Sequence, residues 1–131
     1  MIRTRPGLPS LTLYGAIDVA LVIVFVLIGR ASHSENLLGT LSTLWPFVAG
    51  LAVGWIATRA WRDPVSIAWI GVGVWVSTVV VGMLLRVLSG QGVQTSFVVV
   101  ATIVLGVFLL GWRWIAMIVL RRRARENTPA A

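Results

Sequence analysis

The sequence predicts an all-α integral membrane protein, a four-helix bundle whose helices all cross the bilayer. Hydrophobic residues make up 58% of the 131 positions and charged residues only 11%, with a mean hydropathy of +0.95. Soluble domains carry about 25% charged residues. Apolar runs of about 20 residues, the length that crosses a hydrocarbon core as a helix, occur four times. We therefore expect one membrane domain over residues 1–131.

The four expected spans are separated by short polar breaks, so consecutive helices should be antiparallel neighbours. A β reading of the valine-rich stretches fails, because an open sheet would leave backbone groups unpaired in lipid. The first span is expected to be retained, because it exceeds a signal-peptide core, contains Asp18 and lacks a good cleavage site. The spans are placed at residues 11–29, 41–60, 65–85 and 97–120.

Arginine placement predicts the orientation. The chain has eleven basic residues, all arginine, and a net charge of +7. Only Arg30 and Arg86 lie on the side of the first and third breaks, so the positive-inside rule places both termini in the cytoplasm of a bacterial inner membrane. The other side holds Arg3, Arg5, Arg59, Arg62, Arg121, Arg122, Arg123 and Arg125.

The C-terminal residues 121–131 form an expected basic cytoplasmic tail. Its arginines should bind anionic lipids, at about 1 kcal/mol each near the surface. Nucleic acid is not an expected partner, because the run is short and has no interleaved aromatic residues. Arg30, Arg86 and Arg59 are interpreted as helix-end charges at the level of the lipid headgroups.

Asp18 and Arg113 are the two ionisable residues placed inside spans. Both are expected roughly 10 to 12 Å from the cytoplasmic end, at 1.5 Å per residue. A charge at that depth costs at least about 2.5 to 3.5 kcal/mol, so each should face the bundle interior and find a partner. We predict that they pair. The pair is either structural or a proton or cation site gated by Arg113, and Arg59 is a competing partner for Asp18.

Small residues indicate close helix packing and a hypothetical repeat. Gly50 and Gly54 form a GxxxG motif, which we assign to packing within one chain. Arg30 and Arg86 are 56 positions apart, and the Gly-Trp pairs at 54–55 and 111–112 are 57 apart. This spacing suggests that two helical hairpins arose by duplication, with a parallel arrangement about the membrane normal.

Residue types that carry chemistry are scarce. The chain has no cysteine, and its one histidine, His33, has only Glu35 beside it, fewer ligands than zinc requires. No nucleophile elbow or phosphate loop is present. We expect no enzyme activity, no cofactor and no metal. Tryptophans near the span ends are interpreted as interfacial anchors: Trp45, Trp61, Trp69, Trp112 and Trp114.

Five segments, in their order and spacing, resemble the small actinobacterial membrane-protein family catalogued as domain-of-unknown-function family 3054. The resemblance covers nearly the whole chain and implies a bacterial four-span membrane protein with no assigned activity. The segments are DVALVIVFVLIGRASH (18–33), WPFVAGLAVGW (45–55), GVWVSTVVVGMLLR (73–86), SFVVVAT (96–102) and GWR (111–113).

The sequence therefore predicts an uncharacterised structural or accessory component of the membrane. Its expected partners are the lipid bilayer and either a second copy of the chain or a larger membrane complex. The alternative is a small proton-coupled cation or multidrug transporter that uses Asp18, with Tyr14 one turn earlier. Small multidrug exporters resemble the chain in size and in one acidic residue in the first span. They differ in using Glu there and in lacking a counterpart of Arg113.

Overall fold

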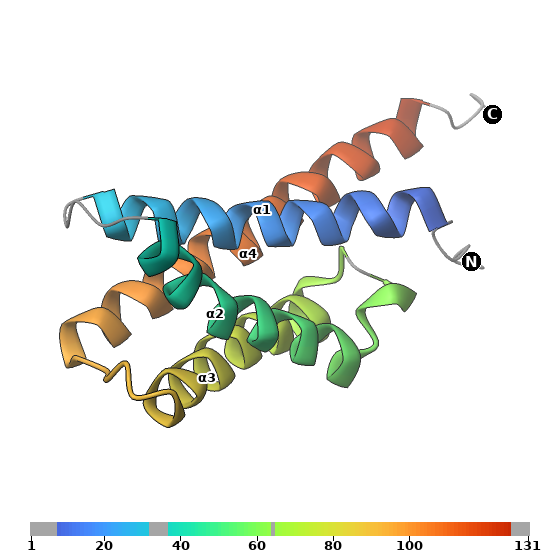
Figure 1. The fold of residues 1–131 in the computed structure, drawn as a ribbon. Helices are drawn as coiled ribbons and strands as arrows, with labels where there is room; N and C mark the ends of the chain where they lie inside the picture. Colours follow the sequence, from blue (N-terminus) through green and yellow to red (C-terminus); the bar gives the residue numbers. More distant parts are fainter. Residues whose placement is uncertain (1–7, 32–36, 64, 127–131) are drawn as a thin grey trace.

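A computed structural model describes residues 8–31, 37–63 and 65–126, and within these ranges the chain is helical with no strand. Four of its helices are long and apolar enough to cross a membrane, which confirms the predicted all-α four-helix bundle. They alternate in direction, so that α1 begins and α4 ends at the same end of the bundle (Figure 1). The helices are α1 (Leu8–Ala31), α2 (Leu37–Thr58), α3 (Val72–Leu88) and α4 (Thr95–Glu126), with the short turns η1 (Ala60–Arg62) and η2 (Ile67–Gly71) between α2 and α3.

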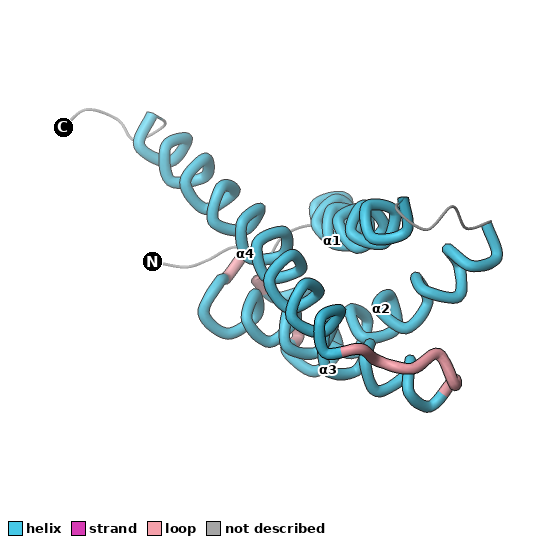
Figure 2. Tube along the Cα trace, turned by 90° about the vertical axis from the view of Figure 1, so that its left-hand side faces the viewer, coloured by secondary structure: helices cyan, strands magenta, loops and turns pink. Residues whose placement is uncertain are grey.

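The helices form a ring in which each one contacts the next and α4 returns to α1. Figure 2 shows α4 running obliquely past the other three helices. Phe25 of α1 packs edge-on against Phe47 of α2, with ring centroids 5.4 Å apart. All four helices contribute to the core, which includes Val22, Val26, Leu51, Val74, Ala101, Leu105 and Leu109.

The α2–α3 hairpin is the most closely packed pair, and the two glycines of the GxxxG motif lie in its interface. A Cβ atom at Gly50 would lie 2.9 Å from the carbonyl oxygen of Thr78, and one at Gly54 would lie 2.9 Å from the Cα of Val74. The Ser77 hydroxyl also donates to the carbonyl of Gly50 at 2.9 Å. The motif therefore brings two helices of one chain together, as predicted.

All four helices begin and end at residues other than the expected ones, and three of these differences have a clear structural basis or consequence. The second helix ends at Thr58, because Arg59 adopts a left-handed backbone with φ of 56°. Before α3, the wide turn η2 carries a bond from the Gly71 amide to the Ser66 carbonyl at 2.9 Å, five residues back. The fourth helix has 32 residues, about 48 Å at 1.5 Å per residue, and it includes positions 121–126 of the expected tail. Residues 127–131 lie outside the described ranges.

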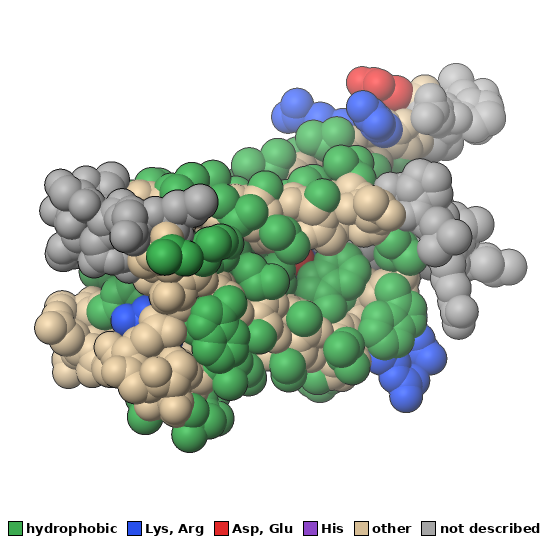
Figure 3. Space-filling view, viewed as in Figure 1, with side chains coloured by type: hydrophobic (Ala, Val, Ile, Leu, Met, Phe, Trp, Pro, Cys, Tyr) green, Lys and Arg blue, Asp and Glu red, His purple; other side chains and the backbone are tan. Residues whose placement is uncertain are grey.

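The flank of the bundle is apolar and its ends are charged. Hydrophobic side chains cover most of the face in Figure 3, and arginines gather at the ends. Large apolar side chains such as Leu38, Ile56 and Trp69 are 73%, 67% and 68% exposed. In water such a surface would drive aggregation, whereas a bilayer covers it with hydrocarbon. The surface is therefore that of a membrane protein.

Candidate functional site

An ion pair between α1 and α4 lies in the interior of the bundle. Asp18 and Arg113 are both fully buried. The Nη2 of Arg113 donates to Oδ2 of Asp18 at 2.6 Å, and its Nη1 donates to Oδ1 at 2.8 Å. Two parallel bonds of this kind match the planar guanidinium to the planar carboxylate. The pairing predicted from matched depths in the two spans is present.

Two tryptophans complete the surroundings of the carboxylate. The indole Nε1 of Trp55 on α2 donates to Oδ2 of Asp18 at 2.7 Å. The indole Nε1 of Trp112 on α4 donates to Oδ1, also at 2.7 Å. Each oxygen therefore accepts two hydrogen bonds. Because an ionised carboxylate offers about four lone-pair positions, protein donors fill its acceptor capacity.

The guanidinium of Arg113 has further contacts that fix its orientation. Its Nη1 also donates to the backbone carbonyl of Leu109, one turn earlier on α4, at 2.9 Å. Its Cζ lies 4.7 Å from the ring centroid of Trp112, a cation–π distance. The Cδ of its stem lies 3.1 Å from where a Cβ would stand at Gly71. Glycine at the end of η2 thus lets the beginning of α3 close over the arginine.

Aromatic and small residues support the two indoles. Tyr14 on α1 stacks on Trp112, with ring centroids 5.8 Å apart and an interplanar angle of 22°. A Cβ at Gly15 would stand 3.9 Å from the Trp55 ring, an ordinary van der Waals distance, so the indole lies directly on the backbone of α1. The three residues Tyr14, Trp55 and Trp112 are only half-buried. They form a partly apolar shell around the ion pair.

The electrostatic consequence is local neutralisation. A single charge at this depth would cost several kcal/mol, whereas a carboxylate and a guanidinium in two-point contact have no net charge. Hydrogen bonds from the indoles to the ionised carboxylate are charge-assisted and stronger than neutral ones. The described geometry thus leaves neither Asp18 nor Arg113 without an opposite charge in contact with it inside the apolar bundle.

The predicted helix-end charges lie away from this site. Arg59 is exposed after the end of α2, and both oxygens of Asp18 are taken by other donors, so the competing pairing does not form. Arg86, at the end of α3, donates to the side-chain oxygen of Gln91 at 3.1 Å and lies 4.7 Å above the Phe97 ring. The side chain of Arg30, and His33 with Glu35, lie outside the description. Within the described residues no three metal-ligating side chains cluster.

The role of the tryptophans is the main feature that sequence reasoning missed. The sequence predicts an interfacial anchor at Trp112, and this prediction is wrong, because its indole N–H is directed to Asp18 in the interior. In the sequence, Trp55 stands out only as part of the repeated Gly-Trp pair. The remaining predicted anchors, Trp45, Trp61, Trp69 and Trp114, are 42% to 68% exposed, as an interfacial position requires.

Comparison with known protein families shows which family the chain belongs to. The sequence model of one protein family, described as a protein of unknown function (DUF3054), matches residues 15–116. The chain belongs to the DUF3054 family. The DUF3054 match includes Asp18, Trp55, Trp112 and Arg113, and it ends before the arginine run at 121–125. No curated protein and no solved structure matches the chain.

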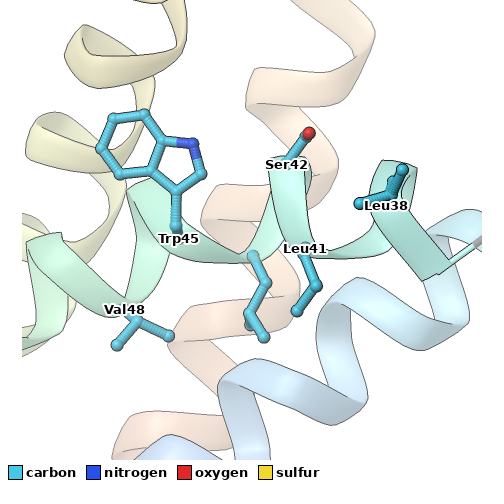
Figure 4. A pocket seen from close by; sticks show the side chains of 6 residues that line it. Leu38, Leu41, Ser42, Trp45 and Val48 are labelled. Atoms are coloured by element: carbon cyan, nitrogen blue, oxygen red, sulfur yellow. The ribbon is translucent and has the colours of Figure 1, made fainter.

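Grooves on the surface of this DUF3054 protein are separate from the buried pair. One open groove lies along the first half of α2, whereas Trp55 stands near the end of that helix. Figure 4 shows Trp45 and Ser42 projecting from this half of α2, with Leu41 and Val48 on another side. A second groove follows α3 and α4 past Trp75, Gly106 and Leu110. Both are lined mainly by apolar side chains, which suits contact with lipid.

Proposed function

We propose that this DUF3054 protein is a non-enzymatic structural or accessory component of the bacterial inner membrane. The observation that carries the proposal is the saturation of Asp18: two guanidinium and two indole donors occupy its two oxygens. A transport acid has to exchange a proton or cation during its cycle. Asp18 would have to break strong hydrogen bonds to do so, which favours a role in holding α1, α2 and α4 together.

The proposed orientation has both termini in the cytoplasm. It is supported by the described arginines at the end where α4 finishes, since Arg59, Arg62 and four arginines of α4 are all exposed there. Arg86, at the opposite end, is half-buried. Exposed arginines at the headgroup level fit anionic lipids, which we propose as partners of positions 121–125.

The accessory role predicts a protein partner, which affinity purification in mild detergent would test. A stoichiometric membrane partner that copurifies with the wild-type chain would support the role. Asp18→Asn is a matched variant, because it keeps the shape of the side chain and removes its charge. A homodimer without any other protein, together with cation transport, would instead favour the small-transporter alternative.

A further inference from the structure

We infer that the bundle contains a recognition site for guanidinium-type cations, and that the chain fills it with its own Arg113. The inference concerns which ligand the site accepts, and it does not depend on whether the protein is an accessory component. The ligand class is small planar cations of the guanidinium or amidinium type, which would bind where the Arg113 side chain is removed or withdrawn.

The contacts made by Arg113 are those that a free guanidinium requires. The two oxygens of Asp18 accept two parallel N–H bonds, at 2.6 and 2.8 Å. The backbone carbonyl of Leu109 accepts a third bond at 2.9 Å, and the Trp112 ring lies 4.7 Å from the central carbon. A carboxylate fork with an aromatic ring favours planar guanidinium over a compact ammonium.

The site is held in place independently of Arg113. Trp55 donates to Oδ2 of Asp18 and Trp112 donates to Oδ1, so donors from two different helices orient the carboxylate. Tyr14, stacked on Trp112, supports one of these donors. After loss of the arginine, the carboxylate would be a buried charge with an aligned pair of oxygens and no counter-ion. Such a group strongly favours binding of a cation.

The space that the Arg113 side chain occupies, together with its surroundings, defines the shape of a complementary ligand. Replacing Arg113 with alanine deletes an ethylguanidinium-shaped fragment, from Cγ to the terminal nitrogens. Its stem lies against Gly71, beside the Leu110 side chain, whose Cδ2 would stand 3.0 Å from a Cβ at Gly71. Leu110 also lines the open groove between α3 and α4. Because Leu110 lies both on the groove and beside Gly71, where the Arg113 stem packs, we expect a small cation to enter from this side.

The test is rescue of Arg113→Ala by ethylguanidinium, measured as the melting temperature in detergent. The expected result is a saturable rise of about 4 °C at about ten times the dissociation constant. Ethylammonium, tetramethylammonium and NaCl at equal ionic strength should give no comparable rise. Wild-type protein should not respond to ethylguanidinium, because its own arginine occupies the site.

The matched control is the double variant Asp18→Asn with Arg113→Ala, which lacks the carboxylate and should lose the response. If Arg113→Ala does not stay folded alone, ethylguanidinium present from solubilisation onward should recover a monodisperse protein. Equal effects of ethylguanidinium on the single and double variants would overturn the inference. So would failure of ethylguanidinium both to stabilise and to recover Arg113→Ala, and so would an equal response to ethylammonium. None of these outcomes changes whether a partner copurifies with the wild-type chain. Failure of this inference is therefore distinguishable from failure of the proposed accessory role.

Discussion

Trp55 and Trp112, 57 positions apart, donate indole hydrogen bonds of 2.7 Å to different oxygens of the same carboxylate. The first comes from α2 and the second from α4, the two ring neighbours of α1. Asp18 is thus bound to both flanking helices, and Arg113 adds a two-point ion pair to one of them.

Removal of one member of the ion pair should destabilise the protein more than removal of both. Asp18→Leu or Arg113→Met leaves an uncompensated buried charge, at a cost of about 3 to 5 kcal/mol. The double variant avoids that charge and retains only the cost of two indole N–H groups without their acceptor. Thermal unfolding in detergent should therefore rank the double variant above either single one. Additive losses would show that the pair is not coupled.

Loss of either indole donor should also lower stability. Trp55→Phe and Trp112→Phe each remove one hydrogen bond to an ionised group, worth about 1.5 to 3 kcal/mol. Trp69→Phe is the control, because that side chain is 68% exposed and its indole donates no hydrogen bond to any described residue. Melting temperatures should fall clearly for the first two variants and little for the third. A fall of the same size for Trp69→Phe would indicate a general aromatic effect.

The α2–α3 contact should be sensitive to a single methyl group. Gly54→Ala places a Cβ 2.9 Å from the backbone of Val74, so the helices must move apart, at about 1 to 3 kcal/mol. Gly111→Ala is the matched control, because nothing lies within 4 Å of its added Cβ and alanine favours helix by about 1 kcal/mol. We expect opposite shifts in melting temperature. A loss at Gly111 would reveal a contact made outside the single chain.

Reporter fusions test the orientation. A reporter that is active only in the cytoplasm should be active when fused after Arg125. A reporter that is active only outside the cytoplasm should be active when inserted between Ser89 and Gln94. The exposed arginines at the end that includes η1 and the last turn of α4 give the physical reason. The opposite pattern would reverse the proposed assignment of the anionic-lipid contact to the cytoplasmic leaflet.

Transport measurements separate the proposed function from its alternative. Vesicles that carry the wild-type protein and a pH gradient should show no proton-coupled uptake of lipophilic cations, because protein donors already saturate Asp18. Empty vesicles set the background. Uptake that Asp18→Asn abolishes would establish a transport role for this residue.

Much of the fold follows from the sequence because hydrocarbon imposes strong constraints on the backbone. Four apolar runs require four helices, and short breaks require antiparallel neighbours. The pairing of Asp18 and Arg113 could be predicted for a similar reason, since two opposite charges at one depth have few other solutions. The packing of Gly50 and Gly54 within the chain also follows the prediction.

The parts that sequence did not predict depend on the rotation of each helix about its axis. Trp112 lies next to Arg113, and its position near a span end is typical of an interfacial anchor, so only the side-chain direction reveals its bond to Asp18. The proposed duplication stays a hypothesis. The matched glycines differ in their contacts, since Gly54 packs on α3 whereas Gly111 has open space.

The long separation of Asp18 from Arg113, 95 positions, has a consequence for biosynthesis. At about 5 to 20 residues per second, the ribosome delivers the arginine about 5 to 20 s after the aspartate. Trp55 follows Asp18 by only 37 positions, so its indole is the first of these donors to be synthesised. During this interval the first hairpin carries an acid without its cation. The ion pair can therefore form only after the fourth helix has been synthesised.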